Sequence, residues 1–325
     1  MAAQATQFAS EWRREIVTRS PAMERVLARA RLSAAGDAGL LLQGASGTGK
    51  RLLARAVHAA SARFGRPFVA LHCGALPEPL LESELFGHVK GAFPGAVHDH
   101  AGLLQSAQGG TLFLAEVSEL PLALQAKLLR ALQERQARAV GATQALPIDV
   151  RVIAGTRREL AEEMAAGRFR AELYYHLNTV TLALPPLAER REDVAPLAAH
   201  FLAAAAERCG KRIEGIAPAA LPPLRTAPWP GNVRQLREVI ERCVAQCGGR
   251  RLSAALVTAA LAPADDDFAA LDAARREFES EYLTRLLRIT DGNVAQAAKL
   301  AKRQRADFLA LLARYALDPK AFKPL

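Results

Sequence analysis

The sequence predicts an α/β domain with a parallel sheet flanked by helices, followed by a helical subdomain and an all-helical domain that contains a helix-turn-helix. Three observations lead to this prediction. Short apolar segments alternate with helical patterns as far as Pro186, which is typical of a parallel sheet covered on both faces. After Pro186 the chain reads as helical. Near its C-terminus, two short helical patterns are separated by a tight turn.

The hydrophobic pattern gives the expected elements in order. One helical pattern begins at Pro21, and another runs from Arg51 to Ala62. Five buried strands are expected, at residues 39–43, 67–71, 110–114, 150–154 and 180–184. Glycine and proline clusters then indicate the boundaries. They predict an N-terminal extension 1–20, an α/β subdomain 21–187, a helical subdomain 188–247, a linker 248–267 and a final helical domain 268–325.

The composition excludes several classes of protein. The 325 residues include 43 Lys and Arg against 33 Asp and Glu, and this net charge of +10 favours nucleic acid over a membrane as partner. Four cysteines are too few for a disulfide scaffold, and no apolar run reaches the ~18 residues that span a bilayer. Residues 1–20 lack a signal core and are too short for a sensory domain. We therefore expect a cytoplasmic protein, whose signal comes from an unidentified regulatory protein, from nucleotide level or from expression.

A glycine-rich loop stands between the first expected strand and the next helix. Residues 44–50 read GASGTGK, the first seven positions of a phosphate-binding loop. Glycines let backbone N–H groups cradle phosphate oxygens, the helix N-terminus faces the same anion, and Lys50 adds a charge for the outer phosphates. The usual Mg²⁺-binding hydroxyl is replaced by Arg51. The predicted nucleotide-binding residues of the loop are Gly44, Ala45, Ser46, Gly47, Thr48, Gly49, Lys50 and Arg51.

Three further motifs follow in a fixed order: ESELFGHVKGAFPGA at 82–96, GGTLFLAE at 109–116 and WPGNVRQL at 229–236. With the loop, they make residues 20–247 resemble the AAA+ domain of bacterial sigma-54-dependent transcriptional activators. The resemblance implies an AAA+ P-loop fold with a helical lid, ATP as cofactor, and a ring-forming ATPase that remodels the sigma-54 polymerase holoenzyme. It also implies self-association from dimers to hexamers, and a role for Arg234 in sensing the γ-phosphate.

The sequence departs from this family at positions that serve hydrolysis. The resemblance implies an aspartate that holds Mg²⁺ before the catalytic Glu116, but Ala115 stands there and has no oxygen to offer. His72 replaces an asparagine that restrains the glutamate, and Arg157 replaces an asparagine at the end of the fourth strand. A glutamate without a well-held metal predicts poor hydrolysis, whereas nucleotide binding depends more on the loop.

The resemblance also implies two arginines that reach into a neighbouring subunit's nucleotide site. Arg170 retains one of them, whereas His176 replaces the other. Histidine is mostly neutral near pH 7 and does not supply the charge that an arginine gives to the transition state.

The loop with which the family contacts sigma-54 is changed at its tip. Its residues here are Gly91, Ala92, Phe93, Pro94, Gly95 and Ala96. Pro94 replaces a threonine, which removes a hydroxyl and a backbone N–H and fixes φ. Phe93 is expected to remain as the exposed aromatic.

Three hypotheses remain open. We favour an ATP-binding, DNA-binding transcriptional regulator with impaired hydrolysis, weakened or absent Mg²⁺ binding and altered contact with sigma-54 polymerase, because the binding loop is intact. The alternative is a competent sigma-54 activator ATPase. A third hypothesis is a DNA-binding scaffold that no longer binds nucleotide. An ATPase assay separates the second hypothesis from the others, and nucleotide-dependent thermal shift separates the first from the third.

The final domain resembles the Fis-type DNA-binding domain that ends this family. A turn and N-cap at 291–293 precede a short helix at 294–300, and a second helix runs from Gln304 to Tyr315. Residues 291–325 contain seven Lys or Arg and three Asp, an excess that suits the phosphates of double-stranded DNA. A helical oligomerisation hairpin is the alternative. The residues expected to reach DNA are Lys302, Arg303, Gln304, Arg305 and Asp307.

No metal site is predicted. Cys243 and Cys247 share a helix face, but no second pair of ligands follows them. His88, His98 and His100 flank the sigma-contact loop without an acidic or cysteine partner.

Overall fold

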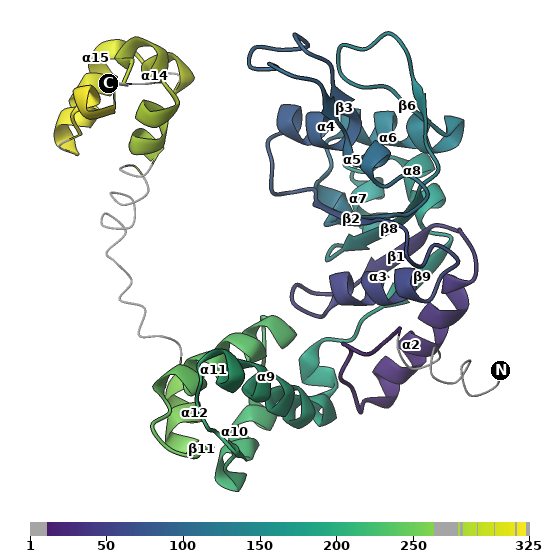
Figure 1. The fold of residues 1–325 in the computed structure, drawn as a ribbon, viewed down its shortest axis with the longest axis vertical. Helices are drawn as coiled ribbons and strands as arrows, with labels where there is room; N and C mark the ends of the chain where they lie inside the picture. The colour runs from purple at the N-terminus through teal and green to yellow at the C-terminus, as the bar shows by residue number, and fades with distance from the viewer. Residues whose placement is uncertain are drawn as a thin grey trace. The chain divides into compact units, whose positions relative to one another are not determined.

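The computed structural model describes residues 12–262, 279, 282–290, 292–301, 303–315 and 317–322, without the side chains of residues 320 and 321. The chain divides into two compact units, residues 1–261 and residues 262–325 (Figure 1). Each unit is described by itself.

A five-stranded parallel sheet forms the centre of the first unit. Its strand order is β2-β5-β8-β1-β9. The strands are β1 (Leu40–Gln43), β2 (Phe68–His72), β5 (Thr111–Ala115), β8 (Arg151–Thr156) and β9 (Val180–Ala183). All five lie where apolar runs predicted them, and the predicted fold class is confirmed. Because the strands are parallel, the residues that follow β1, β2, β5 and β8 meet at one edge of the sheet.

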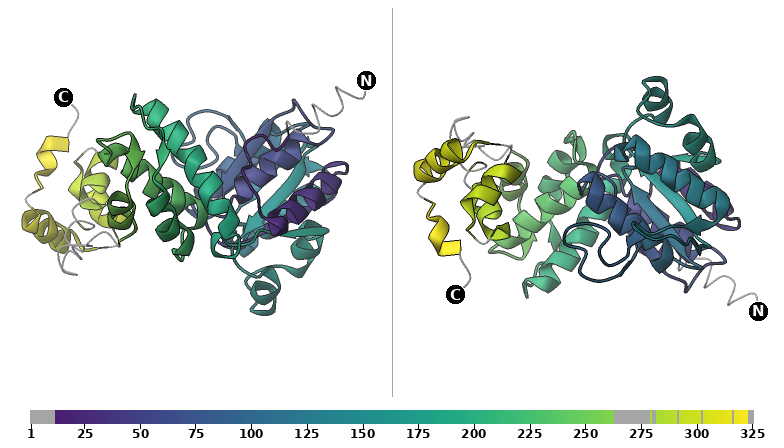
Figure 2. Two further views of the ribbon diagram at one scale, coloured as in Figure 1. Left: turned by 90° about the horizontal axis from the view of Figure 1, so that it is seen from below. Right: turned by 90° about the horizontal axis from the view of Figure 1, so that it is seen from above.

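Helices cover both faces of the sheet, and the strands alternate their apolar side chains accordingly. Leu40, Leu42 and Phe113 pack with α2 (Pro21–Ala34) and α3 (Lys50–Ala59). Leu41 and Leu112 point to the other face. That face is covered by α4 (Glu78–Phe86), α5 (Leu103–Ser106), α6 (Leu122–Glu134), α7 (Leu160–Ala165) and α8 (Ala171–Leu177). Figure 2 views the molecule from these two opposite sides.

Two short hairpins that the sequence analysis did not predict extend from the helices. Strand β3 (Gly87–His88) pairs with β4 (His100–Ala101), and β6 (Gln136–Ala137) pairs with β7 (Leu146–Pro147). A bridge between His88 and Val140 joins the two hairpins. They hold the base of the sigma-contact loop, residues 91–96.

The helical lid follows the sheet. It consists of η2 (Leu187–Glu189), η3 (Arg191–Asp193), α9 (Val194–Arg208), η4 (Pro218–Ala220), α10 (Leu221–Thr226), α11 (Asn232–Gln246) and α12 (Ala254–Leu261). The expectation that strands stop after Pro186 is wrong, because β10 (Gly215–Ile216) pairs with β11 (Arg251–Leu252). Strand β11 and helix α12 also occupy residues expected to be linker, because Leu252 and Val257 are buried in the lid core.

The second unit is a small helical cluster. Described residues 282–289 are helical and precede α14 (Val294–Leu300), α15 (Arg305–Arg314) and η5 (Pro319–Phe322). The side chain of Asn293 accepts hydrogen bonds from the N–H groups of Ala295 and Gln296, so the predicted N-cap is present. Ala297 and Ala298 are buried against Phe308, which lets α14 and α15 approach closely.

A buried histidine makes the stability of the first unit depend on pH. His58 of α3 lies within hydrogen-bonding distance of the Thr111 hydroxyl and the Arg66 carbonyl oxygen, at 2.9 and 3.1 Å. Burial lowers the pKa of His58, and the positive charges of Arg151 and Arg63 lower it further. The hydrogen bond to the Arg66 carbonyl oxygen acts in the opposite direction but is weaker than the effect of burial.

We expect acidification to destabilise the protein through His58. The unfolded chain takes up this proton near the ordinary histidine pKa, whereas the folded chain takes it up at lower pH, so stability falls as pH drops through that range. The thermal midpoint should fall between about pH 7.5 and about pH 5.5, and His58→Gln should reduce the slope. An unchanged slope in His58→Gln would contradict this assignment.

Candidate nucleotide-binding site

The loop between β1 and α3 has the backbone geometry of an anion cradle. Gly44, Gly47 and Gly49 have φ of 156°, 78° and 107°, in a region that side chains disfavour. The Gly44 N–H donates to the carbonyl oxygen of Thr156. Within the described part of the chain, the N–H groups of residues 45, 46, 47 and 49 have no acceptor. These N–H groups can therefore donate to a phosphate at the N-terminus of α3.

Lys50 is the first residue of α3 and is bound inside the loop. Its Nζ donates to the carbonyl oxygen of Gly44 at 2.7 Å and lies 3.1 Å from Oε1 of Glu116. The lysine side chain is only 9% exposed. The ammonium therefore lies between the loop and the end of β5, which is where the outer phosphates of a nucleotide would need a cation.

Glu116 follows β5 and has both carboxylate oxygens engaged. Oε1 contacts Lys50, and Oε2 accepts from the backbone N–H of Arg157 at 3.0 Å. The Arg157 guanidinium lies 4.0 Å from the same Oε2 and 3.2 Å from Glu119. Glu116 also has a left-handed backbone, with φ 53°. Arg157 therefore holds Glu116 from the end of the neighbouring strand β8.

Three residues beside Glu116 complete this edge of the sheet. Ala115 is the last residue of β5 and pairs in register with His72 of β2. His72 accepts a hydrogen bond from the N–H of Gly74, and within the described residues it has none to Glu116. Burial raises the pKa of the Cys73 thiol to about 12, with Glu116 and Glu119 adding to the effect, so this thiol stays protonated.

The lid docks directly on the glycine-rich loop. Asn232, at the start of α11, donates from Nδ2 to the carbonyl oxygen of Ser46 at 2.9 Å. Its Oδ1 accepts from the N–H of Leu187 at 2.8 Å. The N–H of Val233 donates to the carbonyl oxygen of Gly47 at 3.0 Å. The first turn of α11 therefore binds both the glycine-rich loop and Leu187, where the chain enters the lid.

This docking brings Arg234 to the loop and leaves no room for a side chain at Gly47. A Cβ at Gly47 would lie 2.2 Å from the carbonyl oxygen of Gly231. Arg234 donates to the Ser46 hydroxyl at 3.3 Å, so its guanidinium lies beside the cradle. The structure thus brings Lys50, Glu116 and Arg234 together around one loop.

A buried ion pair joins the loop to the N-terminal segment. Arg190 donates to the carbonyl oxygen of Thr48 at 2.8 Å and lies 3.6 Å from Asp193. Burial lowers the pKa of Arg190 despite this partner. Asp193, which is fully buried, also accepts hydrogen bonds from the Thr18 hydroxyl and from the N–H groups of Arg19 and Ser20. Residues 18–20 are therefore fastened to the lid.

A small, mostly apolar cavity of about 80 Å³ lies next to the loop. Its wall comes from the N-terminal segment, α3 and the lid, and includes Ile16, Thr48, Leu52, Leu197, Phe201 and Val233. Such a wall suits the flat, largely apolar surface of a nucleobase. Thr48 was predicted as part of the loop, whereas the sequence analysis did not assign the other five residues to the site, because they come from separate segments of the chain.

Arg170 and His176 lie apart from the loop. Arg170 is the N-cap of α8, where its N–H donates to Gln125 and its Nε donates to the carbonyl oxygen of Leu122 at 3.3 Å. His176 lines a different cavity, together with Gly39, which precedes β1. In the described residues neither side chain contacts the loop of its own chain. This arrangement leaves both side chains away from the phosphates that the same subunit would bind.

The sigma-contact loop, residues 91–96, closes on itself through hydrogen bonds from the N–H of Gly91 to Ala96 and from the N–H of Ala96 to Phe93. Phe93 is half-buried, with its ring centroid 4.9 Å from that of His88. The expectation of an exposed Phe93 is therefore wrong, because the imidazole covers the ring. Pro94 and Gly95 are exposed at the tip.

The residues expected to bind DNA lie at the start of α15. Arg303, Gln304, Arg305 and Asp307 are all exposed there, and Gln304 is the N-cap of the helix. Lys302 lies outside the described residues. The arrangement is that of a helix-turn-helix, with its second helix presenting polar side chains.

Over the described ranges, no three or more His, Cys, Asp or Glu side chains are placed to hold a metal ion. Among the helices of the same residues, none is long and apolar enough to cross a membrane.

A parallel sheet that ends in a phosphate-binding loop, with a helical lid docked on that loop, defines the first unit as an AAA+ P-loop domain. Two family models match the chain: the Sigma-54 interaction domain over residues 16–183 and the AAA+ ATPase lid domain over residues 188–273. The chain is 52% identical over 312 residues to the transcriptional regulatory protein GlrR of Escherichia coli strain K12, covering 96% of this chain and 70% of GlrR.

Other relatives agree with this match. The chain is 47% identical over 303 residues to the transcriptional regulatory protein ZraR of Klebsiella oxytoca, covering 91% of this chain and 68% of ZraR. The crystal structure of NtrX from Brucella abortus in complex with ADP has a TM-score of 0.69 and 33% identity, covering 93% of this chain and 69% of that one. The chain belongs to the family of sigma-54-dependent transcriptional regulators, as its motifs predicted.

The docked lid can be tested at Asn232. This residue is 2% exposed and has a left-handed φ of 54°, so Asn232→Gly keeps the backbone and removes the side chain. We expect the change to destabilise the protein by roughly 1–3 kcal/mol for each buried group left unpaired, measured by urea unfolding. Arg135→Gly is the control, because Arg135 has a φ of 51° and an exposed side chain. Equal losses in both variants would contradict the role of Asn232.

Proposed function

We propose that the chain is an ATP-binding, DNA-binding transcriptional regulator of the sigma-54-dependent family in which ATP hydrolysis is weak. The observation that carries the proposal is the contrast within one site. The loop, Lys50 and Arg234 are arranged to hold phosphates, whereas Glu116 is engaged by two cations and has alanine beside it. Crystal structures of the related NtrX with ADP and with ATP support a nucleotide ligand.

The proposed ATP site fits the residues present. Free N–H groups of the loop would receive the phosphates, Lys50 would neutralise their outer charge, and Arg234 would approach from the lid. The base would lie against the apolar wall of the cavity next to the loop, which includes Phe201 and Val233. Lid, loop and N-terminal segment would thus all contact one ligand.

The residues present do not fit a tightly held Mg²⁺. Magnesium prefers carboxylate oxygens, and Ala115 supplies none at the end of β5. The adjacent Glu116 already binds Lys50, and the Thr48 hydroxyl donates to the carbonyl oxygen of Ala45 at 2.9 Å. We therefore propose that metal binding is weakened.

The state of Glu116 supports slow hydrolysis independently of the metal. A glutamate that orients an attacking water must aim an unused lone pair of a carboxylate oxygen at that water. Here Oε1 faces the Lys50 ammonium at 3.1 Å and Oε2 accepts from the Arg157 N–H at 3.0 Å. Each oxygen therefore has one lone pair left for a water, and the contact that it already makes limits where that lone pair points. We therefore propose that two features slow ATP hydrolysis: the contacts of Arg157 with Glu116, and the absence of a carboxylate at position 115.

The proposal extends to partners with which the family works. We propose that the chain self-associates, as a dimer or up to a hexamer. We also propose that Pro94, at the exposed tip of the loop, alters the contact with sigma-54 polymerase. An unidentified regulatory protein is proposed to control the chain. DNA binding is proposed for the exposed start of α15, where Arg303 and Arg305 supply charge for phosphates. Gln304 and Asp307 are placed to reach base edges.

Binding and turnover should separate in one series of variants. The parent protein should bind a fluorescent ATP analogue but turn over ATP slowly, and Lys50→Ala should lose the binding. Ala115→Asp should restore slight Mg²⁺-dependent turnover, and Ala115→Asp with His176→Arg should restore more, because an arginine finger is worth ~10³–10⁵ in rate. Even then, Pro94 should prevent open-complex formation at a sigma-54 promoter.

The control for Lys50→Ala is Lys90→Ala, which removes an exposed lysine between β3 and β4. This control should bind the analogue as the parent does. Rapid turnover by the parent would overturn the proposal of slow hydrolysis and favour a competent activator ATPase. Failure of the parent to bind the analogue would favour a scaffold that uses no nucleotide.

DNA binding can be tested through its salt dependence. We expect Arg303→Ala with Arg305→Ala to weaken binding to a random-sequence duplex and to reduce the salt slope by about one for each phosphate that is no longer neutralised. Arg285→Ala with Arg288→Ala is the matched control, because these arginines are exposed on the helical residues 282–289 of the same unit, which precede α14. Fluorescence anisotropy over a range of salt concentrations measures both quantities. Equal slopes for the two double variants would contradict the assignment to α15.

A further inference from the structure

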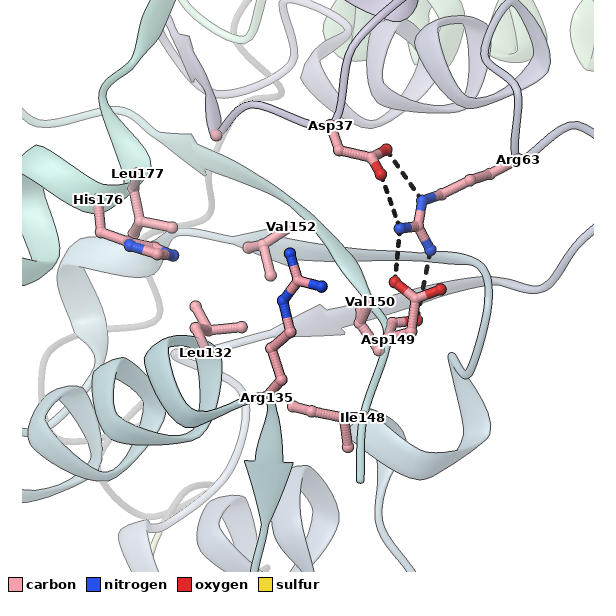
Figure 3. A pocket seen from close by; sticks show the side chains of 11 residues that line it. Asp37, Arg63, Leu132, Arg135, Ile148, Asp149, Val150, Val152, His176 and Leu177 are labelled. Atoms are coloured by element: carbon pink, nitrogen blue, oxygen red, sulfur yellow. Dashed lines mark hydrogen bonds and ion pairs between the residues drawn. The ribbon is translucent and has the colours of Figure 1, made fainter. Parts of the chain in front are cut away.

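A second cavity lies at the opposite edge of the sheet from the phosphate-binding loop (Figure 3). Its volume is about 240 Å³, and it opens beside Gly39 and Val150, which precede β1 and β8. The phosphate-binding loop and Arg157 follow the other ends of these same strands. The cavity is therefore separate from the proposed ATP site. Its volume lies below the roughly 300–1,000 Å³ of sites for drug-sized ligands, so it suits a small molecule.

One wall of the cavity carries a guanidinium that is available for a ligand. Arg135 is the C-cap of α6, where its N–H donates to Ala131 and its carbonyl oxygen accepts from Ile148. This double anchoring fixes its left-handed backbone, and Figure 3 shows the side chain extending into the cavity. Within the described residues the guanidinium of Arg135 has no hydrogen bond and no ion pair. The pKa of Asp37 is lowered mainly by its hydrogen bond with Arg63, and the charge of Arg135 makes a smaller contribution in the same direction.

The opposite wall carries two carboxylates. Arg63 is held between them, at 2.9 Å from Asp37 and 2.7 Å from Asp149. The charge of Arg151 also acts on Asp37, so this wall offers a ligand the Asp149 carboxylate rather than a net negative charge. Oδ1 of Asp149 accepts from Arg63, while its Oδ2 has no hydrogen bond in the part of the chain that the structure describes. A cationic group of a ligand would therefore find a free acceptor here.

Apolar side chains make up much of the remaining lining of the cavity. They are Leu132, Ile148, Val150, Val152 and Leu177. This apolar surface would stabilise a hydrocarbon group of a bound ligand by removing it from water. The cavity therefore offers a cation, an anion and an apolar surface within one small volume.

We propose that this cavity binds a small zwitterion with an apolar group, of which a free α-amino acid with an apolar side chain is the simplest example. The ligand's carboxylate pairs with Arg135, its ammonium group pairs with Asp149, and its side chain covers Val150 and Ile148. This site does not depend on the proposed ATP site, since none of these residues contacts the phosphate-binding loop in the described chain.

The test is isothermal titration calorimetry of the full chain with L-phenylalanine. We expect saturable binding that Arg135→Gln and Asp149→Asn each weaken by about tenfold or more, because each removes a charged hydrogen bond. Arg138→Gln is the matched control, three residues away and outside the cavity lining, and should bind as the parent does. L-phenylalaninamide and N-acetyl-L-phenylalanine, which lack one charge each, should also bind at least about tenfold more weakly.

Several results would overturn the proposal. They are the absence of saturable binding by the parent, unchanged binding by a folded Arg135→Gln, and equal binding of all three ligands. The thermal midpoint of each variant shows that it is folded, and Arg135→Gln should keep the parent's midpoint because its side chain is exposed. Lys50→Ala should leave L-phenylalanine binding unchanged, so failure of the ATP proposal and failure of this one are distinguishable.

Discussion

The contact between Asn232 and the phosphate-binding loop is the constraint on which the rest of the first unit depends. One amide side chain binds both the Ser46 carbonyl oxygen and the Leu187 N–H, so the loop, the entrance to the lid and the start of α11 meet at one residue. Because Asn232 is buried, water cannot replace either bond without opening the interface. The close approach of Gly47 to Gly231 follows from the same docking.

The same docking bears on the proposal that hydrolysis is weak. Because the loop and Arg234 are held together, we propose that the capacity to hold phosphates persists although Ala115 has no carboxylate. Arg157 and His72 lie at the same edge of the sheet but beside Glu116 and Ala115 rather than the loop. In the proposed function their replacement therefore affects how water is activated more than how a nucleotide is held.

The sequence predicted what depends on local pattern. Apolar runs located all five central strands, and the glycine-rich motif located the loop. It did not predict what depends on distant packing: Asn232 meets Ser46 across 186 residues, and the 80 Å³ cavity is assembled from several segments. The two-residue strands β10 and β11 are too short to show a period. Phe93 looked exposed because nothing in its own segment indicated that His88 would cover it.

The attachment of residues 18–20 has a mechanical consequence. This segment is bonded to Asp193 of the lid, and Asp193 pairs with Arg190, which reaches the loop at Thr48. A little earlier, Trp12 packs with the helices that cover the sheet. The segment thus bridges the sheet and the lid as a strap. Any rotation of the lid relative to the sheet would change the tension in this segment. A force applied to the chain near Trp12 would therefore be transmitted to the lid.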